Sequence, residues 1–113
     1  MAKTERELRK ARTESFFRDV NERIAESAER FDSDDAEFVC ECEEATCTQR
    51  VEASLAEYED VRADGTHFLL RPGHEDEQIE RVVRRRRGYE VVEKFHAAVA
   101  RTVRQLNPRT ETA

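Results

Sequence analysis

The sequence predicts an α+β fold, in which a small antiparallel sheet module is flanked by an N-terminal and a C-terminal helix. Near both ends of the chain, apolar residues recur at the three- and four-residue intervals of amphipathic helices. Between them, short runs rich in β-branched and aromatic residues alternate with turn signals. All three cysteines of the 113 residues lie within residues 40–47. A module this small usually needs a cross-link or a bound ion to supplement its core.

The first segment predicts one long helix over residues 4–31. Thr4 and Glu7 match a capping box, and neither Gly nor Pro interrupts the segment. Because its apolar stripe is narrow, the helix is expected to pack on the sheet module or on a second copy of the chain. The stripe consists of Phe17, Val20, Ile24, Ala28 and Phe31.

The centre of the chain predicts two short strands, over residues 38–42 and 48–53, on either side of the cysteine loop. Ser54 then begins a second helix, because "SLAE" is a capping-box pattern followed by apolar residues on one face. Residues 68–70 predict a further strand, which the strong turn signal of Pro72-Gly73 ends.

The last third of the chain predicts a β-hairpin and a final helix. Two valine pairs, at 82–83 and 91–92, flank Arg87-Gly88 and predict the hairpin, although its first arm also suits a helix. A helix is expected over residues 94–106, with disordered residues after Asn107-Pro108. Its predicted apolar stripe is Phe95, Val99, Thr102 and Leu106. The predicted divisions are 1–35 (helix and acidic linker), 36–95 (sheet module) and 96–113 (helix and tail).

Charge and hydropathy disfavour some classes of protein. Charged residues make up 41% of the chain, and the net charge of −6 divides into −2 over residues 1–35, −10 over 36–80 and +6 over 81–113. This division argues against a general nucleic-acid binder, which is usually basic overall. No stretch approaches the roughly 20 apolar residues of a membrane span, and the N-terminus lacks the apolar core of a signal peptide. We therefore expect a cytoplasmic protein, in which thiols stay reduced.

The cysteine spacing C-x-C-x4-C predicts a structural metal site. Structural zinc takes four Cys or His ligands in a tetrahedron, in which sulfur atoms lie about 3.8 Å apart. In an ideal strand, Cys40 and Cys42 would lie about 6.6 Å apart. The chain must therefore bend near Glu41 to bring both sulfurs to one ion, and the loop that follows can return Cys47 to the same point.

The fourth ligand must come from elsewhere in the chain. His74 ranks first because it follows the Pro72-Gly73 turn, ahead of His67 on a short strand and His96 on the last helix. Ligands other than histidine stay open, namely Glu41, Glu43 or a water molecule.

Three alternatives compete with a metal. The cysteines could be buried packing residues, form an opportunistic disulfide, or include a reactive thiol. The flanking glutamates disfavour a reactive thiol, because thiolate activation needs nearby positive charge.

Several motifs resemble those of a group of small uncharacterised bacterial proteins, mainly from actinobacteria. The shared patterns cover roughly half of the chain. This resemblance implies that His74 is paired with the cysteines, and it implies no activity. The patterns are F-x-C-E-C-x4-C (Phe38 through Cys47), L-x-E-Y-E (Leu55 through Glu59), P-G-H-E (Pro72 through Glu75) and G-Y-x-V-V-E-K (Gly88 through Lys94).

The leading hypothesis is a non-enzymatic, zinc-stabilised interaction module that contacts a protein partner or a second copy through its N-terminal helix. Its predicted metal ligands are Cys40, Cys42, Cys47 and His74. No catalytic residue is predicted, because the chain has no Ser-His-Asp cue or Gly-rich phosphate loop. The alternative is a nucleic-acid-binding accessory protein, and a thiol redox protein ranks third. The predicted contact residues for nucleic acid, or for an acidic partner, are Arg84, Arg85, Arg86 and Arg87.

Overall fold

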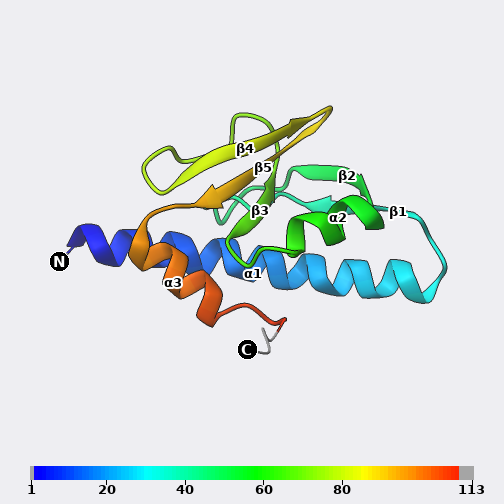
Figure 1. Cartoon of the computed structure of the whole chain (residues 1–113), viewed down its shortest axis with the longest axis horizontal. Helices are drawn as coiled ribbons and strands as arrows, with labels where there is room; N and C mark the ends of the chain where they lie inside the picture. Colours follow the sequence, from blue (N-terminus) through cyan, green and yellow to red (C-terminus); the bar gives the residue numbers. More distant parts are fainter. Residues whose placement is uncertain (1, 110–113) are drawn as a thin grey trace.

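The computed structural model describes residues 2–109 and confirms the predicted α+β class (Figure 1). The long helix α1 (Ala2–Arg30) runs along one side of the molecule, and two small antiparallel sheets lie over it. The other elements are β1 (Asp35–Val39), β2 (Arg50–Ser54), α2 (Leu55–Arg62), β3 (His67–Leu70), β4 (Glu80–Arg86), β5 (Tyr89–Lys94) and α3 (Ala97–Gln105).

The two sheets differ in size and are joined by a backbone hydrogen bond. β1 and β2 form one sheet, and the other has the strand order β3-β5-β4. Just after β1, the N–H of Glu41 donates to the carbonyl of Leu69 in β3 at 2.8 Å. The predicted hairpin is confirmed, with both arms as strands; Gly88 has φ 89° at the turn, a conformation that favours glycine.

The core has two clusters because β3 is buried on both faces. Leu69 packs in one cluster, in which the rings of Phe38 and Tyr58 stack with centroids 4.5 Å apart. Phe68 and Leu70 point the opposite way into the second cluster, as alternation along a strand requires. The second cluster also contains Ile79, Val92, Val99 and Val103, together with Cys40 and Cys42.

Some element boundaries differ from the predictions. The capping box at Ser54 is confirmed, because the Ser54 hydroxyl accepts from the Glu57 N–H and the Glu57 carboxylate accepts from the Ser54 N–H. The box at Thr4 is wrong, since α1 already begins at Ala2. β1 ends at Val39 instead of residue 42, because the chain after Cys40 leaves β2 and pairs through Glu41 with Leu69 of β3.

The final helix begins three residues later than predicted, because Lys94 belongs to β5. Its predicted stripe is correct only at Val99, and Phe95 and Leu106 are exposed. The buried face of α3 is formed by Val99, Ala100 and Val103.

The buried face of α1 is polar, contrary to the predicted apolar stripe. Four residues of the predicted stripe are half-buried, and the fifth, Phe31, is 76% exposed. Seven other residues at helical spacing are buried instead, because most of the polar ones pair with groups on other elements. They are Glu7, Ala11, Glu14, Ser15, Arg18, Asn21 and Ala25.

A buried ion triad joins α1 to the three-stranded sheet. The ammonium of Lys94 donates to Glu14 at 2.5 Å and to Glu80, and all three side chains are buried. Burial raises the pKa of Glu14. Burial alone would lower the pKa of Lys94, but the charges of Glu14 and Glu80 raise it. The cation therefore offsets two carboxylates that could not share this space otherwise.

A second buried cation, Arg18, joins α1 to the loop before β3 and to α3. Its guanidinium donates to the carbonyls of Gly65 and Val103, each at 2.7 Å, and lies 4.5 Å from the centroid of the Phe68 ring. Burial lowers the pKa of Arg18 to about 10. One buried side chain thus connects α1, the loop before β3 and the end of α3.

The chain after α3 returns to α1. The guanidinium of Arg109 donates to Glu22 and Glu59 at 2.6–2.8 Å. The predicted disordered tail concerns mainly residues 110–113, which lie outside the described residues. None of the described helices is both long and apolar enough to span a membrane.

We expect Lys94→Met to lower the free energy of unfolding by about 3–5 kcal/mol, because it leaves two buried carboxylates without a cation. Urea denaturation would measure this loss. The exposed variant Arg101→Ala is the control and should change stability by less than about 0.5 kcal/mol. Replacing the whole triad by apolar residues of similar size should cost far less than Lys94→Met. A single-variant loss no larger than the control's would contradict this view of the triad.

Candidate metal centre

The C-x-C segment is held in place by its middle residue. The Glu41 side chain is buried, and its carboxylate accepts from the Leu69 N–H at 2.9 Å and from the Asn21 amide at 2.7 Å. Asn21 also forms two hydrogen bonds with the backbone of Val39, each 2.8 Å long. Since Glu41 is held between α1 and β3, Cys40 and Cys42 are fixed on either side of it.

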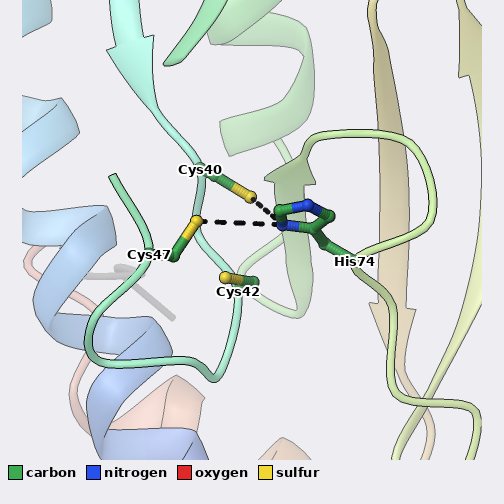
Figure 2. Close-up of side chains that lie close together, drawn as sticks. All are labelled: Cys40, Cys42, Cys47 and His74. Atoms are coloured by element: carbon green, nitrogen blue, oxygen red, sulfur yellow. Dashed lines mark hydrogen bonds between the residues drawn. The ribbon is translucent and has the colours of Figure 1, made fainter. Parts of the chain in front are cut away.

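Three cysteines and one histidine meet beside this segment (Figure 2). The Nδ1 atom of His74 lies 3.5 Å from the Cys40 sulfur and 3.8 Å from the Cys47 sulfur. The ligand atoms of these two cysteines, Cys42 and His74 all lie within 4.8 Å of one another. In a zinc tetrahedron, a sulfur and a nitrogen ligand are about 3.6 Å apart. The four side chains could therefore bind one metal ion with little movement.

The turn after β3 presents His74 to the cysteines, as the Pro72-Gly73 signal predicts. Gly73 has φ 87°, and the His74 N–H donates to the Arg71 carbonyl at 3.1 Å. The Arg71 N–H in turn donates to the Cys40 sulfur at 3.2 Å. The same turn thus places the imidazole and supplies a backbone donor to one thiol, which favours its charged form.

Lys10 of α1 connects the two loops that carry the ligands. Its ammonium lies 2.5 Å from Asp76, two residues after His74, and 3.2 Å from Glu43, next to Cys42. The hydrogen bond to Asp76 raises the pKa of Lys10. Such outer contacts orient the groups that touch a metal.

The three thiols of the cluster do not ionise equally easily, because a thiolate at one cysteine disfavours a second thiolate beside it. A hydrogen bond from Cys40 lowers the pKa of Cys42 to about 5, and His74 acts in the same direction. The same hydrogen bond and burial raise the pKa of Cys40, and burial raises that of Cys47. All three cysteines are free thiols. A divalent cation would let all three ionise together, because its charge offsets theirs.

The remaining candidate ligands have other partners. His67 lies 3.3 Å from Glu93, and His96 lies 2.7 Å from Glu7. Glu41 accepts buried hydrogen bonds, and Glu43 faces Lys10. Among the described residues, the structure thus brings His74 alone of the histidines to the cysteines.

Two of the four hairpin arginines are already paired. Arg84 donates to Asp60 at 2.9 Å, and Arg85 donates to Glu90 at 2.8 Å. Arg86 and Arg87 are exposed near the hairpin tip.

Asn21 and Lys10, which contact the segments that carry the candidate ligands, were not predicted from the sequence. The one signal for them was the helical spacing of polar residues along α1.

Comparison with known proteins finds no family model, curated protein or solved structure that matches this chain. The function must therefore be argued from the geometry and chemistry of the site.

We expect Asn21→Ala to lower the free energy of unfolding by about 1–3 kcal/mol, because the buried groups of Val39 and Glu41 lose their partners. Metal affinity should also fall, by about 10–100-fold, as for other residues that orient ligands. Urea denaturation and competition with a chelator would measure the two effects. Gln78→Ala removes an exposed amide and should change neither quantity. If Asn21→Ala behaves like that control, Asn21 does not support the metal centre.

Proposed function

We propose that the protein is a non-enzymatic, zinc-stabilised module for protein interaction. The observation that carries the proposal is a complete set of four soft ligands, Cys40, Cys42, Cys47 and His74, within 4.8 Å of one another. Structural zinc sites use four protein ligands, whereas catalytic sites keep one position open for water or substrate. A set that fills all four positions suits a structural ion.

The ligand chemistry supports zinc over the common hard cations. Thiolate and imidazole donors favour zinc, and magnesium and calcium prefer oxygen donors. Three thiolates and one neutral imidazole around Zn²⁺ give a net charge near −1. Cys40 and Cys42 are buried, so an ion there would be shielded from water on one side by the core.

The positions of the ligands support a stabilising role. Cys40 and Cys42 follow β1, Cys47 precedes β2, and His74 follows β3. One ion would therefore link the two-stranded sheet to the three-stranded sheet, which the Glu41–Leu69 hydrogen bond also joins. Because an unfolded chain rarely retains a preformed site, metal binding would contribute directly to the free energy of folding.

The contact surface in this proposal lies on α1, next to the cysteine loop. A hollow of about 310 Å³ there includes Phe16, which is 63% exposed. Ala45, between Cys42 and Cys47, forms its edge, so an ion that fixes the loop would also shape this hollow. Exposed aromatic side chains beside arginines are typical of protein contact sites. The lining residues are Arg9, Arg12, Thr13, Phe16, Phe17 and Ala45.

The alternative functions have less support. Nucleic-acid binding would use Arg84–Arg87, but the ion pairs of Arg84 and Arg85 leave fewer charges for phosphates. A thiol redox role would need an accessible thiol with a lowered pKa. Cys42 has a lowered pKa but is buried, and the half-buried Cys47 has a raised pKa.

We expect protein purified without a metal-affinity step to contain one zinc per chain by elemental analysis. Cys42→Ser and His74→Ala should each abolish this stoichiometric zinc and lower the melting temperature, because each removes a direct ligand. The matched control, His67→Ala, should retain one tightly bound zinc and its stability. Unchanged zinc in His74→Ala would exclude His74 as a ligand, and unchanged zinc in Cys42→Ser as well would refute the metal centre.

We expect a photo-crosslinking amino acid at position 16 to form a discrete protein adduct in living cells. The same probe at position 52, on exposed β2, is the control and should not form it. Cys42→Ser should abolish the adduct, because the cysteine loop borders the hollow. An adduct at twice the mass of the chain would identify a homodimer. Equal labelling at both positions would contradict a contact surface on α1.

A further inference from the structure

A second group of ligand-type side chains lies away from the cysteines. Asp64, His67 and Glu93 each place one ligand atom within 4.8 Å of the others. The Nε2 atom of His67 lies 3.3 Å from Glu93 and 3.6 Å from Asp64. The sequence suggested His67 only as an alternative fourth ligand for the cysteines, beside which the structure places His74.

The backbone fixes these three residues relative to one another. His67 and Glu93 stand directly opposite in the β3–β5 ladder, where cross-strand side chains are close neighbours. The His67 N–H donates to the Asp64 carbonyl at 3.0 Å, which closes the turn before β3. The cluster therefore does not depend on long, flexible segments.

Donors outside the cluster orient each carboxylate. The backbone N–H and hydroxyl of Thr66 donate to Asp64 Oδ1 at 2.9 and 2.8 Å, and Asp64 Oδ2 faces His67. Arg81 donates to Glu93 Oε1 at 2.9 Å, and Glu93 Oε2 faces His67. The hydrogen bond from Arg81 lowers the pKa of Glu93. One oxygen of each carboxylate is thus held by the protein, and the other is directed at the imidazole.

The separations suit a metal ion of the zinc class. For nitrogen and oxygen ligands about 2.1 Å from zinc, tetrahedral geometry places the ligand atoms about 3.4 Å apart. The two separations from His67 Nε2, 3.3 and 3.6 Å, lie on either side of that value. Two carboxylates would also neutralise the charge of a divalent ion, which a single histidine could not do.

The cluster borders open space. Asp64 and Glu93 line a cavity of about 640 Å³ between the end of β5 and α3. Arg101 and Arg104 of α3 line the same cavity. Three protein ligands beside an open cavity leave room for water or a small anion to complete the coordination of an ion.

We propose that Asp64, His67 and Glu93 form a second, exchangeable site for a divalent transition-metal ion, with open positions facing this cavity. It differs from the cysteine centre in donor type and exposure: one nitrogen and two oxygen ligands, with the Asp64 side chain 48% exposed. An imidazolium ion pair would use the same three side chains, but it needs a proton on Nε2. A metal needs the lone pair of that atom, so the two states exclude each other.

The test is a titration of the full chain, prepared with zinc at the cysteine centre, with ZnCl2 at pH 7.5. The ring ¹⁵N resonances of the histidines are recorded by NMR. We expect a saturable shift of His67 Nε2 with a stoichiometry of one ion, and no corresponding shift of His96. Mn²⁺ should selectively broaden the resonances of His67 and Glu93. Because the readout is at His67, a negative result would overturn this proposal without affecting the cysteine centre.

Variants separate binding of the ion by these ligands from nonspecific attraction of the ion to surface carboxylates. Asp64→Asn and Glu93→Gln should each weaken Zn²⁺ binding at His67 by about 10-fold or more, while the exposed control Glu52→Gln leaves it unchanged. Zinc retained at the cysteine centre would show that each variant is folded. No saturable shift in the natural protein, or equal affinity in Glu93→Gln and Glu52→Gln, would refute the second site.

Discussion

The fold depends on a buried polar face of α1, because each charged group on that face requires a partner from a different element. Glu14 needs Lys94 of β5, and Arg18 needs carbonyls before β3 and at the end of α3. Removal of one member of such a pair costs several kcal/mol, whereas removal of an exposed charge costs little. Hydrophobic contact tolerates small shifts, but these bonds fix the rotation and the position of the helix along its axis.

The same face couples α1 to the cysteine centre. Asn21 holds Glu41 between two cysteines, and Lys10 lies between the loops that carry Cys42 and His74. Groups that share partners do not contribute independently to stability. Docking of α1 and ordering of the ligands are therefore expected to be cooperative, so that either event favours the other. This arrangement explains how a chain with a small core can maintain a helix as long as α1.

Local sequence signals predicted most helices and strands. They did not predict the contacts between side chains that are distant in sequence. The capping box and the two turn signals depend only on neighbouring residues in the sequence. They therefore identified α2 from Ser54, the hairpin from Arg87-Gly88 and the His74 turn from Pro72-Gly73. The packed face of α1 was predicted wrongly because burial of Glu14 and Arg18 depends on Lys94 and Val103, residues far away in sequence. The cysteine spacing predicted the bend at Glu41, but nothing local showed that His67 would face Glu93 instead.

The polarity of the α1 face also determines what happens when the helix detaches. A helix with an apolar buried stripe would present an adhesive surface on release, and such surfaces promote aggregation. Release of α1 would instead expose Glu7, Glu14, Arg18 and Asn21, which water solvates readily. Release of α1 would therefore uncover the apolar core on the sheet side, whereas the face of the helix that had been buried would be charged and well solvated.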